Sequence, residues 1–261
     1  MSIERHTPGT FCWFELATTD QRSAKQFYQS LFGWEAADSP IGPDEVYTIF
    51  KRDGRDVGAA YTMRPEQRSQ GVPPNWGLYV AVDDADAAAA RAATLGATVL
   101  APPFDVMDHG RMCVLQDPTG AVFSLWQAKT HAGTGITGTH TFSWADLNTR
   151  NQAQAAAFYS ALFDWKMTTG KDMKPASPGG YYHIVNGAEF IGGVPPPEAG
   201  NPHAPSHWLI YVNVADCAGS TAKAKALGAR ASVETMAIGA EGWISVLQDP
   251  QGAVFALHQG K

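Results

Sequence analysis

The chain has 261 residues, of which 44% are hydrophobic and 17% charged, and its formal net charge is −6 at pH 7. These values are typical of a globular protein with a sizeable core. The basic residues are scattered along the chain and usually have acids nearby, whereas nucleic-acid binding requires a clustered basic face. No run approaches the ~20 apolar residues that cross a bilayer, and the polar start MSIERHTPGTF lacks the apolar region of a signal peptide. We therefore expect a cytoplasmic protein with no nucleic-acid or membrane partner.

The first half of the chain is predicted to alternate short strands with helices. Asp20 is a suitable N-cap for a helix with apolar residues on one face. A second, alanine-rich helix over residues 84–95 is predicted to end at Gly96, and a proline-rich loop precedes the strand before it. The predicted strands are residues 11–17, 46–50, 57–62 and 76–82, followed by two strands that flank a turn at 117–120.

The second half of the chain repeats the first. WFELATTDQRSAKQFYQSLFGW, from Trp13, aligns with WADLNTRNQAQAAAFYSALFDW, from Trp144; VLQDPTGAVFSL, from Val114, matches VLQDPQGAVFAL, from Val246, at ten of twelve positions. Two further blocks recur in the same order at offsets near 132, which indicates a duplicated module. We predict module 1 over residues 8–129, a Gly/Thr-rich linker over 130–139 and module 2 over 140–261. Each module is predicted to contain two βαβββ units.

These blocks resemble the vicinal oxygen chelate superfamily, which includes glyoxalase I, extradiol dioxygenases, fosfomycin-modifying enzymes and bleomycin-resistance proteins. The tandem form resembles its glyoxalase-like branch. The resemblance implies an α+β fold in which the paired βαβββ units of each module form a curved, cup-shaped mixed sheet with helices outside. It also implies a small-molecule ligand or substrate in the cup. Because duplication supplies the pairing that single-module relatives reach by dimerising, a monomer and a homodimer are both open.

Most members of that superfamily place a divalent metal in the cup, at three strand positions. The matching residues here are Trp13, Gly77 and Ser124 in the first module and Trp144, Leu209 and Ala256 in the second. None supplies an imidazole, carboxylate or amide ligand, so we expect no metal and no other cofactor. A displaced metal set of Asp146, His207 and His258 is the alternative. Otherwise the histidines are rim residues and Asp146 is a hydrogen-bonded polar group.

Glu15 and Asp146 occupy equivalent strand positions and are predicted to face the cups. A carboxylate on an apolar concave sheet has a raised pKa and can act as a general base, although a structural carboxylate is an equal alternative. Arg111 is a candidate to stabilise an enolate, against the alternative of a surface salt bridge. Cys113 lacks an assigned base. His183 either reaches a cup mouth or is an ordinary strand residue, and we favour the strand residue.

Inward-facing aromatic and rim residues are predicted to bind a flat ligand, although packing of the core would explain the same pattern. The ligand-binding candidates are Trp13, Tyr79, His109, Trp126, Trp144, His207, Tyr211 and His258.

Three functions remain open. The first is an enzyme that acts on a small carbonyl-bearing or aromatic metabolite by metal-free acid–base chemistry of the isomerase, lyase or oxygenase type. The second is a non-catalytic binder that sequesters a drug or metabolite, as bleomycin-resistance relatives do. The third is an interaction protein with vestigial cups. We favour the enzyme, because His109, Arg111 and Cys113 are replaced by Glu241, Trp243 and Ser245 in the second module, which indicates one specialised cup.

Overall fold

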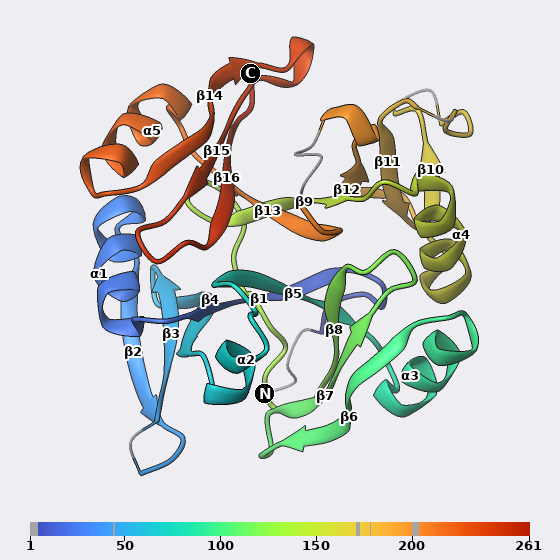
Figure 1. Ribbon diagram of the computed structural model, residues 1–261, viewed down its shortest axis with the longest axis horizontal. Coiled ribbons are helices and arrows are strands. Elements are labelled where there is room, and N and C mark those ends of the chain that lie inside the picture. The colour runs from blue at the N-terminus through green and yellow to red at the C-terminus, as the bar shows by residue number, and fades with distance from the viewer. Residues whose placement is uncertain (1–4, 44, 171–172, 178, 200–203) are drawn as a thin grey trace. The chain divides into compact units, whose positions relative to one another are not determined.

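The computed structural model describes residues 5–43, 45–170, 173–177, 179–199 and 204–261 (Figure 1). The helices of the first module are α1 (Gln21–Phe32), α2 (Pro65–Ser69) and α3 (Ala85–Thr94). Its strands are β1 (Phe11–Thr18), β2 (Glu35–Pro40), β3 (Val46–Arg52), β4 (Arg55–Thr62), β5 (Asn75–Ala81), β6 (Thr98–Val106), β7 (Gly110–Gln116) and β8 (Val122–Ala128).

The second module follows the same succession, with helices α4 (Gln152–Phe163) and α5 (Cys217–Ala226). Its strands are β9 (Phe142–Asn148), β10 (Lys166–Thr168), β11 (Tyr182–Asn186), β12 (Glu189–Val194), β13 (His207–Asn213), β14 (Arg230–Ala237), β15 (Trp243–Gln248) and β16 (Val254–Gln259). Two short 3-10 turns, Pro197–Ala199 and Gly239–Glu241, complete it. Among the described residues no helix has the length and apolar character needed to span a bilayer.

The strand order is the same in both modules. It runs β2-β3-β4-β1-β5-β8-β7-β6 in the first and β10-β11-β12-β9-β13-β16-β15-β14 in the second. β1 pairs with β4 in parallel, whereas β3 pairs with β4 in antiparallel orientation, so the sheets are mixed. The predicted α+β fold of two tandem modules is confirmed.

Local sequence explains most element boundaries. The Asp20 carboxylate accepts a hydrogen bond from the Ser23 backbone N–H (3.0 Å), which caps α1 as predicted. Gly96 follows α3 with a φ of +95°, the conformation expected of a glycine after a helix. The prediction of a continuous loop before β5 is wrong, because that segment contains α2. Pro65 suits the first helical turn, and the Gln67 side chain accepts from the Arg64 N–H (2.9 Å).

The chain forms two compact units that do not coincide with the two modules. Unit 1 comprises Met1–Trp13, Leu78–Gly133 and Trp144–Leu209, and unit 2 comprises Phe14–Gly77, Thr134–Ser143 and Ile210–Lys261. Each unit therefore combines one half of the first module with one half of the second. The predicted module and linker boundaries describe the repeat in the sequence and stay a prediction.

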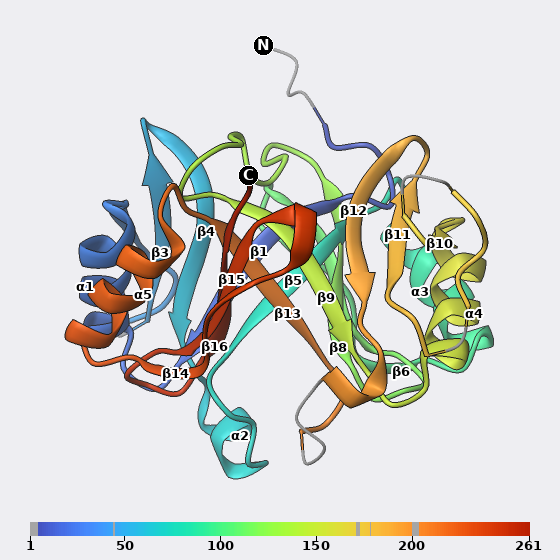
Figure 2. The ribbon, with the colours of Figure 1, turned by 90° about the horizontal axis from the view of Figure 1, so that it is seen from above.

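A buried hydrogen-bonded triad joins the two modules inside unit 2. The Tyr28 hydroxyl, on α1, donates to Oδ2 of Asp249 in the DPQG turn (2.9 Å) and accepts from Trp76 Nε1 (2.9 Å). Asp249 Oδ1 accepts from the Ala253 N–H (2.9 Å), so the same carboxylate also closes its turn. α1 lies beside α5 (Figure 2), and Lys223 Nζ donates to a carbonyl at the C-terminal end of α1.

The equivalent triad stands in unit 1. The Tyr159 hydroxyl, on α4, donates to Oδ2 of Asp117 in the DPTG turn (2.9 Å) and accepts from Trp208 Nε1 (3.1 Å). α3 lies beside α4 (Figure 2), and Arg91 donates to the Ala161 carbonyl. The repeated FY..LF and DPxG blocks thus have a structural role, which is to attach half of one module to half of the other.

Candidate functional site

The first module contains a hydrogen-bonded pair of a carboxylate and a tyrosine. Glu15 on β1 lies opposite Ala59 of β4, and Ala59 lies opposite Ile49 of β3. Tyr47 precedes Ile49 by two residues, so their side chains share a face of the sheet. The Tyr47 hydroxyl donates to Glu15 Oε1 at 2.7 Å. Glu15 is only partly exposed, and a tyrosine of β3, on the far side of β4 from β1, orients its carboxylate.

A second tyrosine, Tyr61 on β4, lies near the same carboxylate. Tyr61 lies opposite Tyr47 in the β3–β4 pairing. Burial raises the pKa of Tyr61, and the charge of Glu15 raises it further, so its hydroxyl stays protonated at neutral pH. Gln67 Nε2 donates to the Tyr61 hydroxyl at 2.9 Å, which links α2 to this site. The short helix that the sequence did not reveal therefore borders the Glu15 site.

The second module contains the same pair at the same register. Asp146 on β9 lies opposite Gly193 of β12, and Gly193 lies opposite His183 of β11. Tyr181 precedes His183 by two residues, as Tyr47 precedes Ile49. The Tyr181 hydroxyl donates to Asp146 Oδ1 at 2.5 Å. Asp146 is 6% exposed, so this carboxylate is a buried, hydrogen-bonded group.

Trp144 completes the second pair. Its Nε1 lies 2.9 Å from Asp146 Oδ1 and 3.0 Å from the Tyr181 hydroxyl. A side chain at position 193 would collide with the Tyr181 hydroxyl, so the glycine there makes room for the pair. Sequence reasoning identified both carboxylates and missed both tyrosines. Tyr47 and Tyr181 are offset by 134 positions, outside the aligned repeat blocks, and no local pattern marks them.

An aromatic cluster occupies another part of unit 1. Trp13 packs edge-on against His131 with ring centroids 4.6 Å apart, and Trp126 packs against the same imidazole at 6.2 Å. Trp126 Nε1 donates to the His131 carbonyl (2.9 Å), and Tyr79 packs on Trp126 at 6.3 Å. Trp13, Trp126 and Tyr79 are all buried. His131 falls in the predicted linker and was not among the candidates, yet it is the centre of this cluster.

Glycines allow the cluster to close. The indole of Trp126 lies where a side chain at Gly110 would stand. Gly133 has a φ of +118°, and a side chain there would collide with the Cys12 carbonyl of β1. These two positions explain how the chain after β8 returns against β1 and brings His131 onto Trp13.

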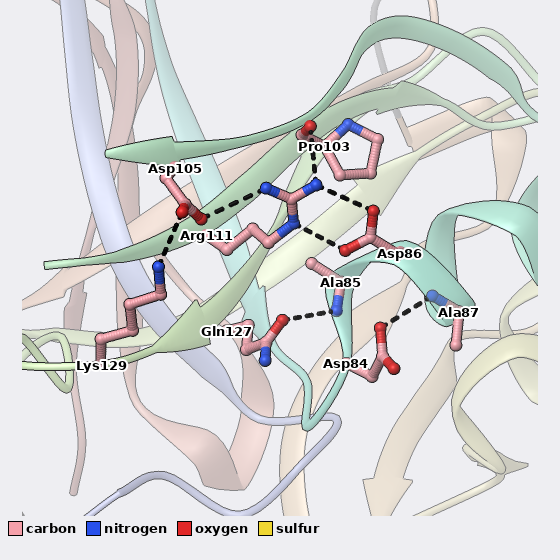
Figure 3. Close-up of polar contacts among 9 residues, drawn as sticks. All are labelled: Asp84, Ala85, Asp86, Ala87, Pro103, Asp105, Arg111, Gln127 and Lys129. Atoms are coloured by element: carbon pink, nitrogen blue, oxygen red, sulfur yellow. Dashed lines mark hydrogen bonds and ion pairs between the residues drawn. The ribbon is translucent and has the colours of Figure 1, made fainter. Parts of the chain in front are cut away.

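Arg111 lies in a network of charged groups (Figure 3). Its guanidinium forms a two-pronged ion pair with Asp86 of α3, at 2.6 and 2.9 Å, and a further ion pair with Asp105 of β6 at 3.2 Å. It also donates to the Pro103 carbonyl, and Lys129 pairs with Asp105 at 2.9 Å. Arg111 holds the pKa of the Asp86 carboxyl below its usual range. This geometry favours the surface salt bridge over the stabilisation of an enolate. Arg111 is therefore not part of the proposed reaction.

The remaining predicted binding residues have separate surroundings. His109 is exposed, and its ring centroid is 6.4 Å from that of His131. His207 Nδ1 lies 2.8 Å from the Pro205 carbonyl. His258 lies between Asn213 Oδ1, at 3.3 Å from Nδ1, and the Glu241 carbonyl, at 3.1 Å from Nε2. Tyr211 is buried on β13.

The residues present do not fit the superfamily's metal ion. Ser124, Leu209 and Ala256 are buried at three of the six family positions, and none has a carboxylate or imidazole to offer. Across the described part of the chain, no group of three His, Cys, Asp or Glu side chains is gathered as a metal ion would need. The displaced set of Asp146, His207 and His258 is therefore not assembled, and we derive no step through a metal.

Comparison with known proteins identifies the family. A model described as "Glyoxalase-like domain" matches residues 13–126 and again residues 144–258. The chain belongs to this glyoxalase-like family, within the vicinal oxygen chelate superfamily. The resemblance noted from the sequence is thereby confirmed.

Two relatives match along nearly their whole length. "Putative glyoxylase CFP32" of Mycobacterium tuberculosis is 40% identical over 251 residues, covering 95% of this chain and 94% of that protein. "Anthracycline biosynthesis protein DnrV" of Streptomyces peucetius is 32% identical over 270 residues, covering 98% and 94%. Among solved structures, the Mn(II)-bound glyoxalase of Novosphingobium aromaticivorans superposes with a TM-score of 0.68 at 13% identity, covering 97% of this chain and 82% of that one. At that identity the likeness concerns the fold alone.

Proposed function

We propose that this chain is an enzyme that performs acid–base chemistry on a small carbonyl-bearing or aromatic metabolite, with Asp146 or Glu15 as the base. One observation carries the proposal. Each module holds a carboxylate that accepts a hydrogen bond from a tyrosine at the start of the module's third strand, Tyr47 within β3 and Tyr181 directly before β11. The acid itself changes from Glu15 to Asp146. A role in the core alone would be met by apolar residues, as at most other positions of these strands.

The geometry suits removal of a proton from carbon. A hydrogen bond from tyrosine favours the ionised carboxylate, which is the form that a base needs, and it also fixes the direction of the carboxylate. The carboxylate would take a proton from the carbon beside a carbonyl, and the electron pair would move onto the carbonyl oxygen as an enolate. Return of the proton to another carbon gives isomerisation, and departure of a neighbouring group gives a lyase reaction.

The names of the relatives support this substrate class. Anthracyclines are fused aromatic rings that bear carbonyl groups, and one relative is named for anthracycline biosynthesis. A glyoxylase name implies a small carbonyl compound. Compounds of both kinds contain a carbonyl group, whose oxygen can accept the electron pair when an enolate forms.

Catalysed exchange of carbon-bound hydrogen tests the proposal without the natural substrate. The protein is incubated in D2O with 1-tetralone, 1-indanone or dihydroxyacetone, and loss of the signal of the hydrogen beside the carbonyl is followed by NMR. Exchange faster than in buffer is expected, and Asp146→Asn or Glu15→Gln should reduce it about 10²- to 10⁴-fold, the usual contribution of a general base. If both variants exchange at the wild-type rate, neither carboxylate is the base.

A second function is favoured by the aromatic cluster of Trp13, Trp126, His131 and Tyr79. Such rings provide contact area for a flat ligand that is held without being changed. This is the binder alternative. Tight binding by calorimetry, with the ligand recovered unaltered by mass spectrometry, would support it over the enzyme. Location in the cytoplasm and a monomeric or dimeric state stay predictions.

A further inference from the structure

His183 is a half-buried residue at a register where the fold does not require a polar group. It occupies the position in β11 that Ile49 occupies in β3. His183 lies opposite Gly193, which in turn lies opposite Asp146. Ile49 lies opposite Ala59, which in turn lies opposite Glu15. An apolar side chain therefore serves at this register in one module and an imidazole in the other. Its Nδ1 is buried and has no hydrogen-bond partner among the described residues.

The surroundings of His183 are aromatic. Its ring centroid lies 4.9 Å from that of Tyr181, 5.7 Å from that of Phe190 and 6.3 Å from that of Trp144, and all three contacts are edge-on. Two of these three rings also hydrogen-bond to Asp146. The imidazole is thus placed among the residues that orient the carboxylate of the second module.

A glycine borders the unpartnered nitrogen. A side-chain carbon at Gly170 would lie 3.5 Å from His183 Nδ1 and 3.3 Å from its Cε1. Gly170 has a φ of +116°, which other residues rarely adopt, so the backbone itself favours glycine there. The side of the ring that carries Nδ1 therefore lies against Gly170 and meets no side chain there.

We propose that His183 belongs to a ligand-binding site of the second module, in which its Nδ1 accepts a hydrogen bond from a hydroxyl group on an aromatic ring. A buried nitrogen without a partner is unfavourable, and a hydroxyl group of the ligand removes that cost. The rings of Trp144, Tyr181 and Phe190 pack against an aromatic ligand. The ligand therefore binds in the second module, which contains Asp146, rather than in the first, which contains Glu15. The site rests on the proposed function only where Asp146 is taken as the base.

Binding of 2-naphthol tests the site directly. Its affinity is measured by calorimetry beside that of 2-methoxynaphthalene, which has the same rings and no hydroxyl hydrogen. His183→Ile places the first module's residue at this register, and Ile49→Val is the matched control in that module. We expect 2-naphthol to bind more tightly than 2-methoxynaphthalene, and His183→Ile to weaken 2-naphthol about tenfold, which corresponds to ~1.4 kcal/mol. Ile49→Val should leave both affinities unchanged.

A second measurement covers the case in which His183→Ile does not fold. In the wild-type protein with 15N-labelled histidine, 2-naphthol should shift the Nδ1 resonance of His183, assigned with His183→Gln, and 2-methoxynaphthalene should not. Equal affinity of wild type and His183→Ile for 2-naphthol overturns the proposal. So does failure of the wild type to bind 2-naphthol, or an Nδ1 resonance that 2-naphthol leaves in place.

The two proposals fail in different ways. If His183→Ile weakens 2-naphthol while neither Asp146→Asn nor Glu15→Gln changes hydrogen exchange, the proposal of a base is wrong and the His183 site is supported. If Asp146→Asn slows hydrogen exchange while His183→Ile leaves 2-naphthol affinity unchanged, the proposed enzyme is supported and the His183 site is wrong.

Discussion

Two kinds of tyrosine–carboxylate hydrogen bond occur in this chain, and they differ in how closely the modules match. In the triads, Tyr28 bonded to Asp249 and Tyr159 bonded to Asp117 have the same partners, a tryptophan included, at nearly equal distances. In the candidate sites only the carboxylate–tyrosine bond is shared. Around it, His183 stands where the first module has Ile49.

This difference separates structure from function within one repeat. Residues that join half of one module to half of the other must complement each other in both units, so the triads stay alike. Residues that contact a ligand in one site are free to differ in the other. The mismatch at position 183 is therefore more informative about function than the identities of the triads.

The largest expected effect concerns the triads at alkaline pH. Burial raises the pKa of Tyr28 and Tyr159 well above the ordinary value. The unfolded chain loses these phenolic protons near pH 10 while the folded chain retains them, so stability is present below pH 10 and is lost as pH rises. The loss should be about 1.4 kcal/mol per pH unit for each tyrosine. Urea unfolding between pH 9 and 11.5 measures it. Tyr28→Phe should have a shallower dependence, and an equal slope would contradict the account.

Removing a triad hydroxyl at neutral pH should be the next largest effect. Tyr159→Phe leaves the buried Asp117 carboxylate without one donor and the Trp208 Nε1 without its acceptor. The free energy of unfolding should fall by about 2–3 kcal/mol, measured with urea at pH 7. Tyr28→Phe should cost a similar amount if the triads are equivalent. A loss confined to one of the two variants would break the symmetry.

The tyrosines of the candidate sites sharpen the contrast. Tyr181→Phe removes the 2.5 Å bond to Asp146, and the carboxylate keeps Trp144 Nε1 as a donor. Exchange of 1-tetralone should slow about tenfold, the ~1.4 kcal/mol expected for one hydrogen bond to a charged group. Tyr47→Phe in the first module should change it much less. The reverse ranking would move the reaction to the Glu15 site.

The smallest effect is expected at Arg111. Its ion pairs with Asp86 and Asp105 lie on the surface, where solvent and salt screen them. Arg111→Gln should lower Tm slightly at low ionic strength and hardly at all in 1 M NaCl, and it should leave hydrogen exchange unchanged. Loss of exchange in this variant would return Arg111 to the reaction.

The sequence by itself determined the repeat, the succession of βαβββ units and several boundaries, whereas it did not reveal α2. These are local or periodic properties. Asp20 caps a helix because its carboxylate reaches the N–H three residues later, and Gly96 ends one because it adopts a positive φ. The alternation of side chains along a strand also indicated that Glu15 and Asp146 share a position and a face.

Only the tertiary structure decided what those carboxylates contact. Alternation fixes the face of a strand and leaves open which strand lies beside it and at what register. Tyr47 is 32 residues from Glu15, and Tyr181 is 35 residues from Asp146, so no short pattern links them. His131 reaches Trp13 because Gly133 allows the returning chain to lie against β1. The sequence favours an ordinary strand residue at His183, because its unpartnered nitrogen is a property of packing, which a sequence does not display.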